Sequence, residues 1–198
     1  MKRRKTAEHS IAYAGLRFRV RVRPVRYSRI QFGDKGPVLT VPPGVDPMGM
    51  LMKKQRWVEK TRDRLREARR EAASLTLVRR SGPGFDALVR ECVTDWAARL
   101  RVRPGAVTLR RMKRRWGSCH HDGRITLNRC LQWLPDHLVA YVVCHELLHL
   151  RIRRHGPRFK GRMLELFPDA RRHEEELNLY GFRLLACTGP GIRPPAGD

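Results

Sequence analysis

The sequence predicts an α+β protein in which an N-terminal antiparallel β-sheet precedes a mainly helical region. Residues 16–23 alternate apolar side chains with arginine, a pattern that only a half-buried strand satisfies. Gly33-Asp34-Lys35-Gly36 is a turn sequence between strand-like segments at 27–32 and 37–41, and it indicates a hairpin. Residues 135–150 are apolar on nearly every side, which is typical of a buried central helix. Strands followed by helices are the α+β order.

The first predicted strand carries arginine on one face and apolar side chains on the other. The apolar face is expected to pack against a core, and the other face is a row of four guanidinium groups, those of Arg17, Arg19, Arg21 and Arg23. Two interpretations of this row stay open. It is either a contact surface for nucleic acid or a charged guard against pairing at a sheet edge.

The rest of the chain divides into further helices and strands. Residues 46–73 have the spacing of a connecting amphipathic helix, and Ser81-Gly82-Pro83-Gly84 has the composition of a linker, so we place a domain boundary near residue 80. Helices are expected at 85–100, 157–167 and 169–185, and strands at 107–112 and 124–128. The predicted organisation is a disordered basic N-terminus (1–9), a sheet with an amphipathic helix (10–80), a metal-binding domain (81–186) and a disordered Gly/Pro tail (187–198).

The buried helix contains the motif His145-Glu146-Leu147-Leu148-His149. Two histidines four residues apart lie on one face of a helix, so their imidazoles can hold one metal ion while Glu146 faces its bound water. Polar groups buried among apolar side chains need a ligand or a partner. This spacing indicates a zinc hydrolase site, with His145 and His149 as zinc ligands.

A third zinc ligand is expected at His155. In an unbroken helix His155 would lie about 15 Å from His145, so the helix must end near residues 151–154 and the chain must turn back. Three protein ligands with one open position form the catalytic arrangement of zinc, whereas structural zinc sites close all four positions. The alternative third ligand is a carboxylate from a later helix, either Glu165 or Glu174.

Charge and cysteine content limit the location and the partners. The formal net charge is +24, and 35 of the 43 basic residues are arginine, which either draws in polyanions such as nucleic acid or reflects a compositional bias. Five cysteines without a C-x-x-C pair indicate a reducing compartment, and Cys119-His120-His121 before a tight turn is interpreted as a loop. Without a secretory signal or a bilayer-length apolar run, we expect a cytoplasmic protein without membrane contact. The sequence does not indicate an oligomeric state.

Several segments together resemble the YgjP-like metallopeptidase family. They are Arg115-Trp116-Gly117-Ser118-Cys119, Gly123 to Asn128, and Val142 to His149 followed by His155, Phe159 and Pro168-Asp169. The resemblance covers about residues 85–185, and the N-terminal sheet with Val41-Pro42-Pro43 and Trp57 is similar to the first part of the family. It implies a zincin fold with a mixed sheet packed on the metal helix, one zinc ion on the three histidines, and Glu146 as the catalytic carboxylate. The related SprT-like and WLM-type proteases share the histidine spacing. Metzincins differ, since they have glycine at the position of Ile152.

The predicted function is zinc-dependent hydrolysis of a protein or peptide substrate, with Glu146 as general base. Asn128, His173 and Tyr180 are the candidates for contacting the substrate or stabilising the oxyanion, and the sequence does not choose among them. A substrate strand is expected to pair with residues 125–128. Two alternatives remain: a nucleic-acid-binding protein with a structural metal, and a zinc hydrolase of non-peptide amides or esters.

Overall fold

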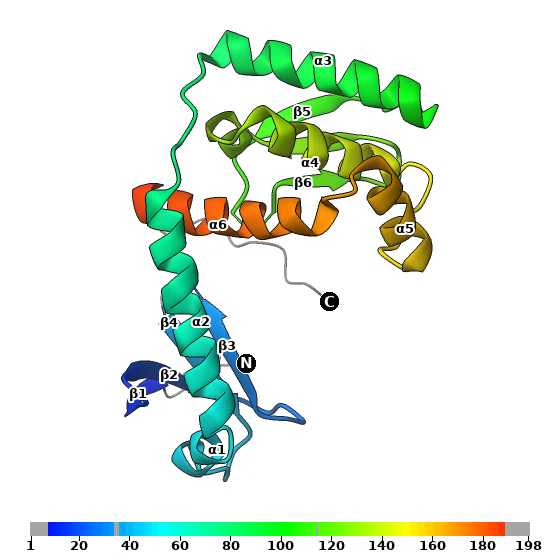
Figure 1. The fold of residues 1–198 in the computed structure, drawn as a ribbon. Helices are drawn as coiled ribbons and strands as arrows, with labels where there is room; N and C mark the ends of the chain where they lie inside the picture. The colour runs from blue at the N-terminus through cyan, green and yellow to red at the C-terminus, as the bar shows by residue number, and fades with distance from the viewer. Residues whose placement is uncertain (1–7, 34–35, 114, 189–198) are drawn as a thin grey trace, which may run out of the picture. The chain divides into compact units, whose positions relative to one another are not determined.

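The computed structural model describes residues 8–33, 36–113 and 115–188 (Figure 1). It divides into two compact units, residues 1–70 and 71–198. The predicted disordered ends lie mostly outside the described residues, although the first strand already begins at Glu8 and the last helix continues to Thr188. No described helix combines the length and the apolar composition needed to cross a membrane.

The first unit contains a four-stranded sheet. Its strands are β1 (Glu8–Tyr13), β2 (Leu16–Val22), β3 (Arg29–Gly33) and β4 (Gly36–Val41), in the order β1-β2-β4-β3. The predicted hairpin joins β3 and β4, and β1 pairs with β2 in the same antiparallel manner. The prediction of a wholly antiparallel sheet is wrong for β2 and β4, which pair in parallel. After β2 the chain skips one strand position and forms β3 at the edge of the sheet. The hairpin then brings β4 back into the position between β3 and β2, where it runs parallel to β2.

The core of this unit confirms the alternating pattern. Phe18 and Val20 of β2 and Leu39 of β4 are fully buried on one face of the sheet, where they pack with Leu51 and Val58. Those two residues belong to α1 (Pro47–Lys53) and α2 (Gln55–Ser74), which together replace the single helix expected at 46–73. The Asp46 carboxylate accepts hydrogen bonds from the N–H groups of Met48 and Gly49 and so caps α1.

The second unit places a small mixed sheet against a central helix, as predicted. The strands β5 (Val107–Arg110), β6 (Gly117–Cys119) and β7 (Ile125–Asn128) have the order β5-β7-β6, with a parallel β5–β7 pair and an antiparallel β6–β7 pair. The central helix is α4 (Asp136–Leu148), which contacts β6 and β7 and lies between α3 (Gly82–Leu100) and α6 (Ala170–Thr188) (Figure 1). The remaining elements are the 3-10 helix η1 (Arg129–Trp133) and α5 (Pro157–Leu166).

The segment predicted as a linker, Ser81 to Gly84, begins α3 instead. The Ser81 hydroxyl accepts a hydrogen bond from the Gly84 N–H, and Pro83 lies in the first turn, where its missing N–H costs no helical bond. A Ser-Gly-Pro-Gly sequence therefore acts here as a helix start rather than as a flexible connection.

Residues 75–80 belong to the second unit, although we expected a domain boundary near residue 80. The Val78 N–H donates to the Trp133 carbonyl at 3.0 Å, and the Arg80 guanidinium donates to the Gln132 carbonyl at 2.9 Å. From α6, the Tyr180 hydroxyl donates to the Thr76 carbonyl at 3.1 Å. These hydrogen bonds attach the extended segment to η1 and α6, and they account for the division at residue 70.

Candidate metal centre

Three histidine side chains converge at the end of α4. The Nε2 atom of His155 lies 3.0 Å from Nε2 of His145 and 3.0 Å from Nε2 of His149. Helix α4 ends at Leu148, slightly earlier than predicted, and the Ile152 N–H still donates to the Leu148 carbonyl as the chain turns. The expected reversal therefore brings His155 back to the two helical histidines.

A hydrogen bond fixes the tautomer of His149. Its Nδ1 atom lies 3.1 Å from the Ile152 carbonyl oxygen, which can only accept, so Nδ1 carries the proton and Nε2 keeps its lone pair. Metal-binding histidines are commonly oriented in this way, through the second ring nitrogen. Ile152 makes the turn without a positive φ, which explains why this chain needs no glycine there.

Phe159 packs against all three imidazoles. Its ring centroid lies 4.8 Å from that of His145, 4.6 Å from that of His149 and 4.8 Å from that of His155, and the side chain is buried. This ring from α5 limits the rotation of the three imidazoles. Sequence reasoning gave Phe159 no role of its own, and its position four residues after His155 was the available signal.

The environment of His145 and His149 favours their neutral forms. Burial, together with the neighbouring imidazoles of His149 and His155, lowers the pKa of His145 to about 3. Burial also lowers the pKa of His149. Neutral imidazole is the form that binds metal. A tetrahedral zinc ion holds its ligands at about 2.0–2.1 Å, which places two ligand nitrogens about 3.3 Å apart, so the observed cluster fits a three-histidine metal site.

Glu146 follows His145 in α4, and its side chain is buried against β6. Burial raises the pKa of its carboxyl to about 8, although the charge of Arg115 and a hydrogen bond from the Cys119 N–H act in the opposite direction. A Cβ atom at Gly117 would lie 2.5 Å from both Cγ and Oε1 of Glu146. Only glycine at this position leaves room for the carboxylate, a requirement that sequence reasoning did not detect in Trp116-Gly117-Ser118-Cys119.

The structure places Asn128 in a loop-holding network. Its Oδ1 accepts from the N–H groups of Met112 and Cys130, and its Nδ2 donates to the carbonyls of Met112 and Arg115 at 2.9 and 2.8 Å. Because Asn128 is also fully buried, its amide is occupied in holding the backbone groups of Met112, Arg115 and Cys130. The structure therefore gives this side chain an architectural role.

The other two oxyanion candidates lie outside the histidine cluster as well. His173 stacks on Tyr141, with ring centroids 5.2 Å apart and an interplanar angle of 8°, and Tyr180 bonds the Thr76 carbonyl. The alternative metal ligands are also engaged elsewhere, since Glu165 pairs with Arg162 at 2.6 Å and Glu174 accepts from the Tyr141 hydroxyl at 3.2 Å. Among the described residues, the metal-ligand group contains only His145, His149 and His155.

The expected pairing of a substrate strand with residues 125–128 is wrong. Strand β7 is the middle strand of its sheet and pairs with β5 on one side and β6 on the other. Its backbone groups are therefore already used, whereas β6 lies at an edge of the three-stranded sheet.

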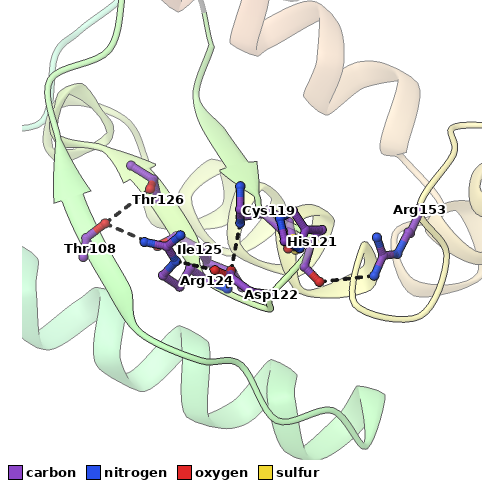
Figure 2. A network of polar contacts seen from close by, with 9 residues as sticks. Thr108, Cys119, His121, Asp122, Arg124, Ile125, Thr126 and Arg153 are labelled. Carbon is purple, nitrogen blue, oxygen red and sulfur yellow. Dashed lines mark hydrogen bonds and ion pairs between the residues drawn. The ribbon is translucent and has the colours of Figure 1, made fainter.

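The loop predicted at Cys119-His120-His121 begins only after Cys119, which ends β6. Residues 120 and 121 form the loop, and they help to hold the turn between His149 and His155. The Asp122 carboxylate accepts from the Arg124 N–H at 3.0 Å and from its Nε at 2.7 Å, and it lies 3.0 Å from Nδ1 of His120. Figure 2 shows this network continuing to Arg153, whose guanidinium donates to the His121 carbonyl at 3.2 Å. The β6–β7 turn thus anchors the segment that returns His155.

Residues 84–180 match the sequence model of the family described as the YgjP-like, metallopeptidase domain. The chain contains a YgjP-like metallopeptidase domain. Among solved structures, the chain is similar to the metallopeptidase zymogen of Pyrococcus abyssi abylysin, with 23% identity and a TM-score of 0.43, over 52% of this chain and 98% of that one. The zymogen of Methanocaldococcus jannaschii jannalysin gives 22% identity and a TM-score of 0.40, over 45% and 84%. The search of curated proteins found no match. The YgjP-like domain is a metal-dependent peptidase, and its substrate is a protein or a peptide.

Proposed function

We propose that this protein is a zinc-dependent metallopeptidase in which His145, His149 and His155 hold the ion and Glu146 acts as general base. The observation that carries the proposal is the convergence of three imidazole Nε2 atoms beside a buried carboxylate. When bound, zinc supplies Lewis-acid chemistry, since it lowers the pKa of a water molecule to near 7 and polarises a carbonyl.

The role of Glu146 follows from its environment. A carboxyl group whose pKa is raised to about 8 can take a proton near neutral pH and give it back in a later step. Glu146 would remove a proton from the attacking water and deliver it to the leaving amine. The Cys119 N–H and the space at Gly117 support the carboxylate in its place against β6.

The substrate backbone would pair with the open edge of β6. This strand carries Gly117, directly against Glu146, and its other side is already paired with β7. An extended peptide added to a sheet edge gains main-chain hydrogen bonds, so the edge would bring its scissile bond close to the carboxylate. An isolated non-peptide amide or ester lacks that repeated backbone, which favours a peptide substrate.

A structural metal site is the less favoured alternative. Structural zinc is closed by four protein ligands, and the described part of the chain offers three side chains at this position. The three-ligand set leaves one position for a water or substrate oxygen, as catalysis requires.

Metal analysis of His155→Ala tests the ligand set. The variant should contain far less than one zinc per chain and lose peptidase activity, because removing one of three ligands weakens metal binding by about 100-fold or more. The exposed His121, whose side chain lies outside the cluster, supplies the control His121→Ala, which should retain both properties. An unchanged zinc stoichiometry in His155→Ala would move the third-ligand role to Glu165 or Glu174.

A further inference from the structure

The sheet of the first unit has one face that is dominated by guanidinium groups. Arg17, Arg19 and Arg21 alternate with the buried residues of β2 and therefore lie on the face opposite the core. Arg29 of β3 joins the same face, because it pairs in register with Thr40 of β4, which in turn pairs with Arg21. We call these four residues the arginine face.

The topology rules out protection of a sheet edge as the reason for this row. Strand β2 pairs with β1 on one side and with β4 on the other, so it has no free edge to protect. Of the two interpretations that the sequence left open, the structure retains the one in which the arginines form a contact surface.

The arginine face has an acidic residue in register with it, since Glu8 of β1 pairs with Arg21. Its other in-register neighbours include Ser10 and Ala12 of β1 and Gln31 of β3, which are uncharged and exposed. The opposite face of the sheet packs with Leu51 of α1 and Val58 of α2. The sequence of this unit is also strongly basic, which adds to the positive electrostatic potential: residues 1–70 contain 20 of the 43 basic residues and only six acidic ones.

The spacing and chemistry of the face suit a chain of phosphates. Alternate residues of a strand lie about 6.6 Å apart, and neighbouring strands about 4.8 Å apart, so the arginines form a regular array. A guanidinium group binds phosphate through two hydrogen bonds, and its plane can also stack on a base. Stacking of a base on a side chain requires a base that is splayed out of a duplex, which favours an unpaired strand.

An exposed aromatic side chain lies directly before this array in the sequence. Tyr27 is 69% exposed, two residues before Arg29, and the Arg26 guanidinium lies 5.1 Å from its ring centroid. Aromatic rings beside a basic surface are the usual stacking platforms for single-stranded nucleic acid. Tyr27 is therefore an independent observation that points to the same class of ligand.

We propose that the arginine face binds single-stranded nucleic acid, with phosphates on Arg17, Arg19, Arg21 and Arg29 and a base stacked on Tyr27. This function is separate from the peptidase reaction and uses none of the residues of the metal centre.

Binding of a fluorescein-labelled oligo-dT of about 15 nucleotides, followed by anisotropy, tests the proposal on the full chain. The triple variant Arg17→Gln/Arg19→Gln/Arg21→Gln should bind about tenfold or more weakly at about 100 mM salt. The slope of log affinity against log salt should also fall by about 2, since each lost phosphate contact removes about 0.7 on a single strand. Tyr27→Ala should weaken binding with little change in that slope.

A charge-matched control separates a built surface from a general positive charge. Arg56, Arg64 and Arg69 are exposed on α2, so their triple glutamine variant removes the same charge and should change the affinity by less than about twofold. If the arginine-face triple does not fold, the exposed pair Arg17→Gln/Arg29→Gln replaces it, with Arg64→Gln/Arg69→Gln as its control. Peptidase activity should be unchanged in all of these variants.

Four results would overturn the proposal. They are no binding at low salt, equal losses in the arginine-face and control variants, tighter binding to a duplex than to the single strand, and tighter binding to a poly-glutamate peptide. The last two would assign the surface to a double helix or to an acidic protein instead.

Discussion

Gly117 determines how closely the Glu146 carboxylate can pack against β6. Burial and the hydrogen bond from the Cys119 N–H both affect the pKa of Glu146. A side chain at residue 117 would displace the carboxylate from this environment. The atoms that a Cβ at this position would meet first are Cγ and Oε1 of Glu146 itself, both at 2.5 Å. The position of Glu146, the proposed general base, is therefore set by a residue that carries no functional group.

Gly117→Ala should lower peptidase activity by about 100-fold while one zinc ion per chain is retained. A displacement of about 1 Å in a reacting group is enough for such a loss, and the histidine cluster is not touched by the added methyl group. The control is Gly161→Ala in α5, because a Cβ at Gly161 meets no atom within 4 Å. Wild-type activity in Gly117→Ala would show that the carboxylate does not need its position against β6.

At this scale the sequence was informative about residues that carry chemistry and uninformative about residues that position them. The spacing of His145, Glu146 and His149 depends only on helix geometry, which a sequence displays directly. The contacts of Phe159 and Gly117 depend on how α5 and β6 pack on α4, and no local pattern reports them. Asn128 was selected for its amide, which the fold uses to hold a loop.

Helix α4 is held to α6 by polar contacts as well as by packing. The His137 Nε2 atom lies 2.8 Å from Glu176 Oε2, and the Tyr141 hydroxyl bonds Glu174. Burial alone would raise the pKa of Glu176, but hydrogen bonds from His137 and Arg172 outweigh it and hold the pKa below the usual value of 4.5. The ionised form of Glu176 therefore stabilises the folded chain.

This shift predicts a pH-dependent contribution to stability. Since the folded pKa is below the unfolded one, the stabilisation is fully present above pH 4.5 and is lost as the pH falls through the folded pKa. At neutral pH, Glu176→Gln should lower the free energy of unfolding by about 0.5–1 kcal/mol. Urea unfolding from about pH 7 to pH 3 should show this difference shrinking only below pH 4.5.

The neighbouring Glu175 provides the control for that measurement. Its carboxylate pairs with Arg171 at 3.3 Å and is 65% exposed, so Glu175→Gln should have a smaller effect at every pH. A difference between wild type and Glu176→Gln that stays constant down to about pH 3 would contradict the assigned role of the carboxylate.

Elements with a strong internal pattern were predicted well, and elements defined by their neighbours were not. The alternation of β2 and the apolar character of α4 are properties of single segments, and both were confirmed. The parallel pairing of β2 with β4 and the central position of β7 are set by the path of the chain between strands. The start of α3 at Gly82 depends on the Ser81 cap, which overrides the linker-like composition.

For the whole molecule, the predicted α+β class is confirmed, and the two units divide at residue 70. The alternating sequence already predicted a row of arginines on one face of a strand, but only the fold could add Arg29 of β3 to that face and show that β2 has no free edge. The extended residues 75–80 have no local pattern of their own, and tertiary hydrogen bonds assign them to the metallopeptidase unit.

The most direct test of the central claim is peptide hydrolysis by Glu146→Gln, measured with a peptide library alongside zinc content. The account predicts one zinc per chain, an unchanged fold and a loss of activity of about 100-fold or more, because the base is removed while the three histidines stay in place. Glu165→Gln, which alters an exposed carboxylate outside the cluster, should retain full activity. Wild-type hydrolysis by the zinc-loaded Glu146→Gln enzyme would contradict the account.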